Sequence, residues 1–139
     1  MVKSMSAPLA EEDSEHRQQI RWKTILWCTF QKGRKIFYGE VIDLSLGGIF
    51  VKSEAEVAVQ DQLIMEIHVP ASGSIQLLGS VRYVGRFLAE DGSLRGFGVR
   101  FERIRKADVP KLLQLAKLAT NPAEAKRVLE VHAEGLSFY

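Results

Sequence analysis

Cysteine is almost absent from this sequence, because Cys28 is the single one among 139 residues. An intrachain disulfide is therefore excluded, and so is a zinc site built from several cysteines. Cys28 stands in a strand-like apolar run, where we expect a small buried side chain rather than a nucleophile. The three histidines, at positions 16, 68 and 132, share no metal-like spacing, so no metal site is predicted.

Long apolar runs are also missing from the sequence. No run approaches the ~20 residues of a membrane-spanning helix. The first residues carry acids instead of the apolar core of a secretory signal, so we expect a cytoplasmic protein without membrane insertion. Neither a G-x-S-x-G nucleophile elbow nor the Gly-Lys-Ser/Thr of a Walker A loop is present. The sequence therefore predicts no enzyme activity.

The composition is that of an ordinary globular protein, with 46% hydrophobic and 26% charged residues. The formal net charge is only +2, but the charge is unevenly distributed. Acids prevail in residues 1–15, whereas residues 16–39 contain six basic residues and no acid, and residues 82–106 are basic again. Two basic stretches on one small domain favour an anionic partner.

Apolar patterning divides the chain into three parts. Residues 1–15 lack periodicity and are predicted to be a flexible tail. Residues 16–105 contain six strand-like runs: 22–31, 35–43, 49–53, 62–69, 75–89 and 97–102. Tight turns join them, which predicts a mainly β fold, a small six-stranded antiparallel (split) β-barrel. Within the long fifth run, Gly79 and Gly85 predict bends or bulges.

The last part, residues 106–139, changes to a helical period. Apolar residues recur every three or four positions between Val109 and Ala119, which predicts an amphipathic helix. Asn121, Pro122 and Glu124 have the order of an N-cap, a first-turn proline and an N3 acid, so a second helix begins there. We expect this C-terminal helical extension to pack on the barrel or on a second copy of the chain.

One set of residues combines two arginines with a glycine-rich turn: Arg17, Arg21, Asp43, Ser45, Gly47 and Gly48. The two arginines, four positions apart, lie on one side of a helix or strand and suit phosphate or a guanine edge. The Asp-Ser-Gly-Gly stretch separates two apolar runs, so a turn between strands is predicted. Because the tail directly precedes the arginines, we expect both on a flexible arm rather than on a strand.

The chain contains both motifs twice, and the layout separates the copies. Arg82 and Arg86 form a second arginine pair, followed by Asp91-Gly-Ser-Leu-Arg-Gly96. Asp91 follows Arg86 by 5 positions, enough only for a hairpin tip. Asp43 follows Arg21 by 22 positions, enough for two strands and a turn. The second copy is therefore predicted to be the turn of a β-hairpin.

The first copy resembles the signature of the PilZ family, R-x-x-x-R and then [D/N]-x-S-x-x-G, over roughly residues 15 to 105. PilZ proteins are cytoplasmic bacterial receptors for cyclic di-GMP. The resemblance implies a receptor that binds this ligand, needs no cofactor and catalyses nothing. It also implies that Arg17 and Arg21 clamp phosphate and guanine, and that Asp43 accepts hydrogen bonds from guanine. Ser45 and the backbone at Gly47 and Gly48 are expected to complete the contact. We add Arg82 as an extra contact, because it follows Gly79-Ser-Val81 on the strand that is expected to run near the site.

Binding is then expected to pull the N-terminal arm onto the barrel and to signal to a protein partner. Two alternatives remain open at this point. Some members of the family lack a working signature and act through protein contacts alone. A basic barrel with interspersed aromatics also suits single-stranded nucleic acid, although alternating aromatics in strands are more often core, so nucleic acid is not the expected partner. A homodimer through the helices also stays open.

Overall fold

In the described residues, six strands precede the helices, and a two-residue strand follows them. The computed structural model describes residues 20–45, 48–89 and 92–139. The elements, in chain order, are β1 (Ile20–Lys32), β2 (Lys35–Ser45), β3 (Gly48–Lys52), β4 (Gln62–Val69), β5 (Gly73–Ala89), β6 (Gly92–Ile104), η1 (Lys106–Asp108), α2 (Val109–Gln114), η2 (Leu115–Leu118), α3 (Pro122–Glu134) and β7 (Ser137–Phe138).

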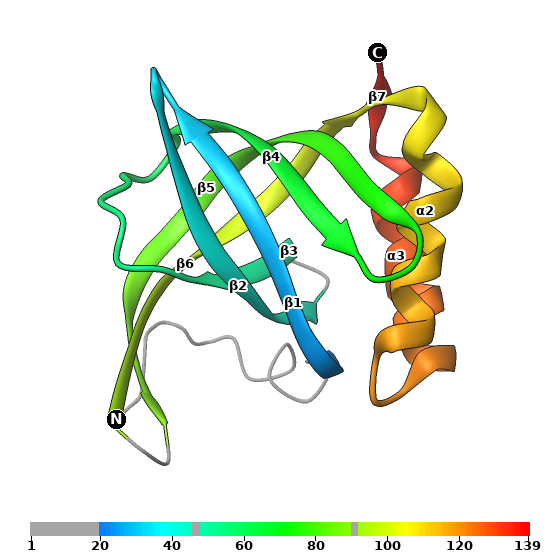
Figure 1. Ribbon diagram of the computed structural model, residues 1–139, viewed down its shortest axis with the longest axis horizontal. Helices are drawn as coiled ribbons and strands as arrows, with labels where there is room; N and C mark the ends of the chain where they lie inside the picture. Colours follow the sequence, from blue (N-terminus) through cyan, green and yellow to red (C-terminus); the bar gives the residue numbers. More distant parts are fainter. Residues whose placement is uncertain (1–19, 46–47, 90–91) are drawn as a thin grey trace.

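In the described part of the chain, six antiparallel strands close into a barrel (Figure 1). The strand order is β3-β2-β1-β4-β5-β6, and pairing of β3 with β6 closes the ring. This confirms the predicted mainly β barrel with helices after it. The two-residue strand β7 lies parallel to β6 and was not predicted from the sequence.

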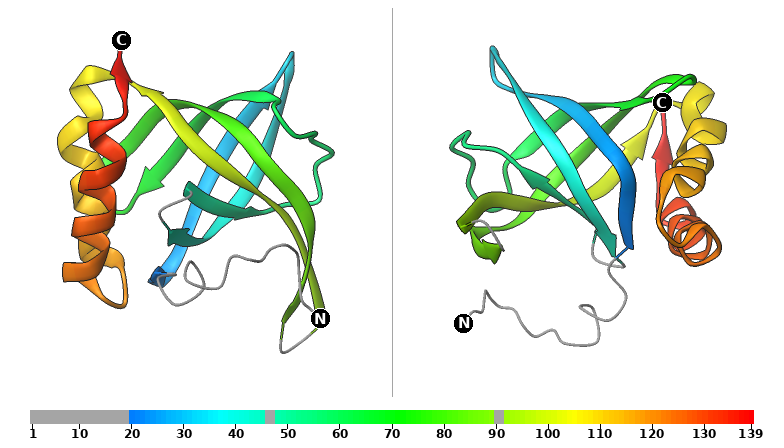
Figure 2. Two further views of the ribbon diagram at one scale, coloured as in Figure 1. Left: turned by 180° about the vertical axis from the view of Figure 1, so that it is seen from behind. Right: turned by 60° about the horizontal axis from the view of Figure 1, so that its bottom comes forward.

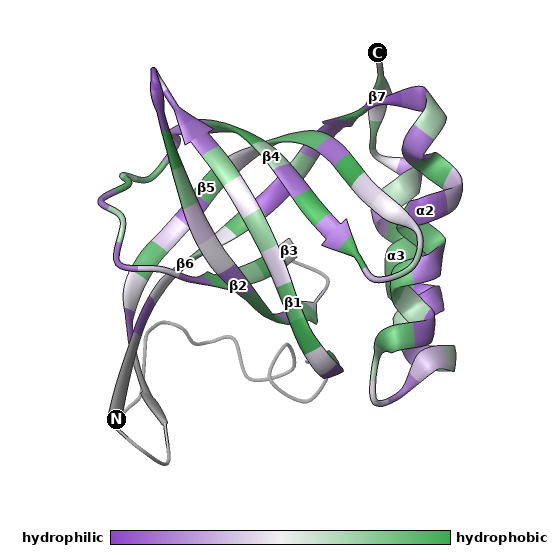
Figure 3. Ribbon diagram, in the orientation of Figure 1, coloured by the Kyte–Doolittle hydropathy of each residue, from purple (hydrophilic) through white to green (hydrophobic). Residues whose placement is uncertain are grey.

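Alternation of apolar and polar residues explains why these segments form strands around one core (Figure 3). In β4, every second side chain from Leu63 to Val69 is buried, while the residues between them are exposed or half-buried.

Cys28 on β1 is fully buried in the same core. Burial raises the pKa of its thiol to about 12, against a smaller opposing effect of a backbone hydrogen bond with Gly39. The prediction that Cys28 is a small buried side chain is confirmed.

The long strand β5 carries two irregularities in its pairing with β6. The register shifts between Leu78 and Gly79, near the bend or bulge predicted at Gly79, but the unpaired residue there is Glu102 on β6. It shifts again between Val81 and Tyr83. Arg82 is the unpaired residue of the second shift. A bend or bulge was predicted at Gly85, and the pairing shows no bulge there. Gly85 instead pairs regularly with Gly96 in the β5–β6 hairpin. This hairpin is the predicted location of the second motif copy, although the tip residues 90–91 lie outside the described residues.

The helices pack against one side of the barrel (Figures 1 and 2). Their buried residues belong to the same cluster as the barrel core: Leu112, Leu115, Ala116, Ala119, Ala125, Val128 and Leu129. The second helix begins as predicted, with the Asn121 side chain accepting a hydrogen bond from the Glu124 amide at 3.4 Å. None of the helices in the described residues is both long and apolar enough to span a membrane.

A buried carboxylate fastens the start of the helical extension to the barrel. The Asp108 side chain is 1% exposed and accepts hydrogen bonds from the Gln76 amide (2.8 Å) and from Arg105 (2.9 and 3.1 Å). Lys111 Nζ lies 3.3 Å from the same carboxylate. Burial raises the pKa of Asp108, but these donors outweigh the burial and leave the pKa below its usual value. The carboxylate is therefore a fixed point between β5 and the helices.

We predict that Asp108→Ala lowers the free energy of unfolding by about 1–3 kcal/mol at neutral pH, because the Gln76 amide loses its partner. The folded-state pKa is depressed, so the carboxylate stabilises the fold above the pKa of free aspartate. That contribution is lost as the pH falls through the folded-state value. The deficit of the variant should therefore shrink below about pH 4. Urea denaturation of both proteins across this range measures it.

Asp61→Ala is the matched control, since Asp61 pairs with Lys32 at the surface. It should cost less than Asp108→Ala. Equal losses in the two variants, or a deficit at Asp108 that does not change in acid, would contradict the anchoring role.

Candidate ligand-binding site

The antiparallel pairing of β1 with β2 places Arg21 directly opposite Asp43. The preceding pair, Ile20 and Leu44, is buried in the core. Because successive side chains of a strand point to opposite faces, Arg21 and Asp43 belong to the outer face of the barrel. On the next strand, β3, Phe50 pairs with Asp43 and extends this row of residues. A cation, a carboxylate and an aromatic ring are thus neighbours on three adjacent strands.

Asp43 is the unusual member of this row because it is 8% exposed although it lies on the outer face. Burial raises the pKa of its carboxyl to about 6, and the positive charge of Arg21 opposes this rise. Arg21 itself is exposed. At neutral pH the site therefore presents a carboxylate that has lost most of its water, beside a solvent-accessible guanidinium. Such a pair can exchange hydrogen bonds with a planar ligand that carries both donors and acceptors.

The end of β2 follows two residues after Asp43. Ser45 pairs with Gly48, the first residue of β3, so the predicted turn between two strands is confirmed, with residues 46–47 outside the described part. The Ser45 carbonyl lies 2.7 Å from Nε2 of His132 on α3. Gly48 has a φ of +131°, and a Cβ there would lie 1.9 Å from the Val99 carbonyl oxygen. Close approach of β3 to β6 requires this glycine, whatever the ligand.

The structure brings together four of the predicted site residues: Arg21, Asp43, Ser45 and Gly48. Arg17 and Gly47 lie outside the described residues. The expectation that the arginines lie on an arm rather than on a strand is wrong for Arg21. That residue belongs to β1, because its neighbours Ile20 and Trp22 pair with β2 and with Ala119.

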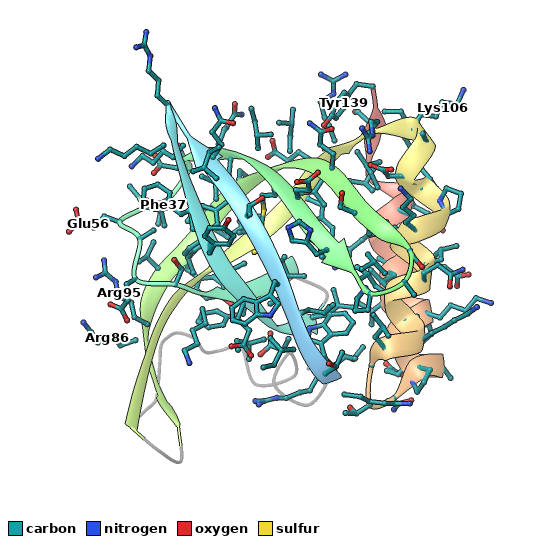
Figure 4. All side chains as sticks on the ribbon, viewed as in Figure 1. Phe37, Glu56, Arg86, Arg95, Lys106 and Tyr139 are labelled. Atoms are coloured by element: carbon teal, nitrogen blue, oxygen red, sulfur yellow. The ribbon has the colours of Figure 1, made fainter. Side chains whose placement is uncertain are left out.

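Arg82 stands apart from this group. It is exposed on β5, and β3 and β6 separate that strand from β2 around the ring. Three strand spacings amount to ~14 Å. Arg86, the other arginine of the second pair, lies opposite Arg95 on the β5–β6 hairpin, on the side of the barrel away from the helices (Figure 4). The second motif copy therefore does not rebuild the arrangement of the first.

The sequence did not point to two aromatic residues close to the Arg21–Asp43 pair, Phe50 on β3 and Tyr83 on β5. Phe50 and Tyr83 stack with ring centroids 6.4 Å apart. The Tyr83 ring covers Gly98, where an added Cβ would lie 2.2 Å from it, and Tyr83 is 49% exposed. The Gly-Phe-Gly spacing of residues 96–98 was the available signal, since a glycine in a strand often marks a surface covered by a ring. His132 had no local signal, because its contact with Ser45 spans 87 positions.

Among the described residues, no group of three or more His, Cys, Asp or Glu side chains is placed to hold a metal ion. The described side chains of the site include a guanidinium, a carboxylate and an aromatic ring, groups that take part in hydrogen bonding, charge pairing and stacking.

Comparison with known proteins addresses the fold and the family. The family model of the PilZ domain matches residues 15–117. No curated protein matches the sequence. Among solved structures, the inhibitor of motility MotI/DgrA of Bacillus subtilis is similar with a TM-score of 0.55 and 22% identity. The match covers 70% of this chain and 48% of MotI.

Two further similar structures contain c-di-GMP. MrkH of K. pneumonia in complex with c-di-GMP has a TM-score of 0.56 and 16% identity, covering 69% of this chain and 48% of MrkH. The PilZ domain of YcgR from Escherichia coli with c-di-GMP has a TM-score of 0.51 and 15% identity, covering 84% of this chain and 91% of that domain. The chain thus spans about half the length of MotI and MrkH, and at these identities the likeness shows the fold.

The family match extends over the barrel, through α2 and into η2, and the closed antiparallel barrel with its glycine-bounded β2–β3 turn agrees with it. The chain belongs to the PilZ domain family.

Proposed function

We propose that this PilZ domain is a cytoplasmic receptor for cyclic di-GMP and acts by binding rather than by catalysis. The cross-strand neighbours Arg21 and Asp43 carry the proposal, because one residue suits a phosphate or guanine acceptor edge and the other the guanine donor edge. The c-di-GMP in the similar MrkH and YcgR structures supports the same ligand. A cyclic dinucleotide has both anionic phosphates and planar bases, the two features that this outer face of the barrel can meet.

Each residue has a role in the proposed complex. The Asp43 carboxylate accepts hydrogen bonds from N1–H and N2–H2 of one guanine, as a bidentate acceptor. The Arg21 guanidinium contacts phosphate or the guanine edge and offers its plane for stacking. Ser45 and the backbone at Gly47 and Gly48 border the same base. Arg82, three strands away, contacts the part of the ligand farthest from Asp43.

Arg17 completes the clamp from the residues that precede β1. Its contact with the bound ligand would draw these residues onto the barrel and change the surface that a downstream protein partner meets. A ligand shifts such an equilibrium only when it binds one state better than the other. In the proposal, Arg17 contacts the ligand only in the state in which the residues before β1 lie on the barrel, so the ligand binds that state more tightly.

Removing the Arg21 fork tests the clamp directly. A charged hydrogen bond contributes about 1.5–3 kcal/mol, so Arg21→Ala should weaken cyclic di-GMP binding about 10- to 150-fold in calorimetric titration. Arg21→Lys should also lose affinity, because an ammonium group does not reproduce the planar fork. Arg34→Ala removes the same charge at the exposed β1–β2 turn and should bind as the unchanged protein does. Equal affinities of the Arg21 and Arg34 variants would contradict the assignment.

The buried carboxylate predicts a pH dependence of binding. Asp43 has a pKa of about 6 in the empty site, raised by burial. Only its ionised form accepts both guanine protons, so protonation competes with the ligand as the pH falls through that value. Affinity should therefore change little above about pH 7 and fall about tenfold by about pH 5. Calorimetry over this range measures the profile.

Asp43→Asn is the control for this profile, because it keeps the shape of the side chain and removes its titration. The variant should bind weakly at every pH and show a flat profile. If the unchanged protein is also flat between about pH 5 and pH 7, Asp43 is not the group that accepts from the ligand.

A further inference from the structure

The start of β1 is hydrogen-bonded to the helical extension at the residue that carries the candidate cation. The Thr120 amide donates to the Arg21 carbonyl oxygen at 2.8 Å. The next residue, Trp22, forms an isolated antiparallel bridge with Ala119. Both contacts fall in the short connection between η2 and α3 (Figures 1 and 2). The backbone position of Arg21 therefore depends on where this connection lies.

The end of β2 is held by the same extension through a side chain. His132 on α3 lies with Nε2 2.7 Å from the Ser45 carbonyl oxygen, and its ring packs 5.5 Å from the ring of Phe101 on β6. Burial lowers the pKa of His132, and the nearby Arg100 lowers it further, while the Ser45 carbonyl acts in the opposite direction. The neutral ring donates its Nε2–H to this carbonyl. Ser45 is two residues from Asp43, so the contact fixes the strand end beside the buried carboxylate.

The extension that makes these two contacts is itself firmly attached. Its apolar side belongs to the barrel core, including the fully buried Leu112 and Leu129. Its first residues are anchored by the Asp108 carboxylate on the Gln76 amide. The extension thus connects the ends of two strands that the barrel pairs antiparallel, and these two ends carry Arg21 and Asp43.

We infer that His132 is a positioning residue for the ligand site, and that docking of the helical extension on the barrel is coupled to ligand binding. The docked extension holds the β1 start and the β2 end in the arrangement that ligand recognition needs, so the ligand binds with less reorganisation. Coupling is reciprocal, and bound ligand stabilises the docked extension by the same factor. The inference rests on the proposed cyclic di-GMP binding. It adds the helical extension, beside the residues that precede β1, as a second segment whose position on the barrel responds to the ligand.

The test removes the Nε2–H donor and measures cyclic di-GMP affinity by calorimetry. His132→Ala should bind about three- to tenfold more weakly, the range expected for a lost neutral hydrogen bond. His132→Gln places an amide N–H near the same carbonyl and should recover most of the affinity. His68→Ala is the matched control, since His68 is exposed on β4, two strands from β2. It should bind like the unchanged protein.

Hydrogen exchange of the unchanged protein provides a readout that does not depend on a variant folding. Saturating cyclic di-GMP should slow exchange of the Thr120 amide and of the α3 amides by about three- to tenfold, as reciprocity requires. Amides at the far end of the β1–β2 hairpin, where Gln31 pairs with Ile36 and Lys32 with Lys35, should not change, because they lie at the opposite ends of these strands from Arg21 and Asp43.

The outcomes separate the two proposals. If the unchanged protein does not bind cyclic di-GMP, the proposed function fails, and the coupling fails with it. If it binds, while His132→Ala matches His68→Ala and exchange in α3 does not respond, only the coupling is overturned. A loss in His132→Gln as large as in His132→Ala overturns the role of the hydrogen bond. Should His132→Ala fail to fold, the Gln variant and the exchange experiment decide.

Discussion

The register between the first residues of β1 and the last residues of β2 determines what this protein presents on its outer face. Pairing Ile20 with Leu44 buries two apolar side chains, and it follows that Arg21 and Asp43 meet on the opposite face. A slip by one residue would exchange these faces and put charges into the core. The hydrophobic core therefore fixes the face of the barrel on which this polar pair lies.

Asp43 opposes folding while the site is empty. Its pKa of about 6 in the folded protein exceeds the ~3.9 of an unfolded chain, so its ionisation at neutral pH costs stability, and this cost disappears as the pH falls below the lower value. Asp108, which is 1% exposed against 8% for Asp43, has the opposite shift because three donors surround it. The contrast separates a carboxylate whose burial is outweighed by hydrogen-bond donors from one whose burial is only partly offset by the charge of Arg21.

The sequence predicted what depends on local pattern. Alternating apolar residues located the strands, and Asn121 with Pro122 located the start of α3, because the period of side chains and the chemistry of caps are local. Features that depend on distant partners were missed. Arg21 lies on a strand because β2 and Ala119 pair with its neighbours. The unpaired residue of β5 is Arg82 because pairing with β6 sets the register, so the glycine at position 85 did not indicate where the irregularity lies.

The burial of Cys28 has a practical consequence for labelling. Its thiol is fully buried and its pKa lies near 12, so almost no thiolate is present at neutral pH and maleimides or oxidants do not reach it in the folded protein. A cysteine introduced at the surface of α3 would therefore accept a dye or a spin label alone, with the native residue left in place. Alkylation of Cys28 itself then reports opening of the barrel, since the sulfur becomes reactive only when the strands around it separate.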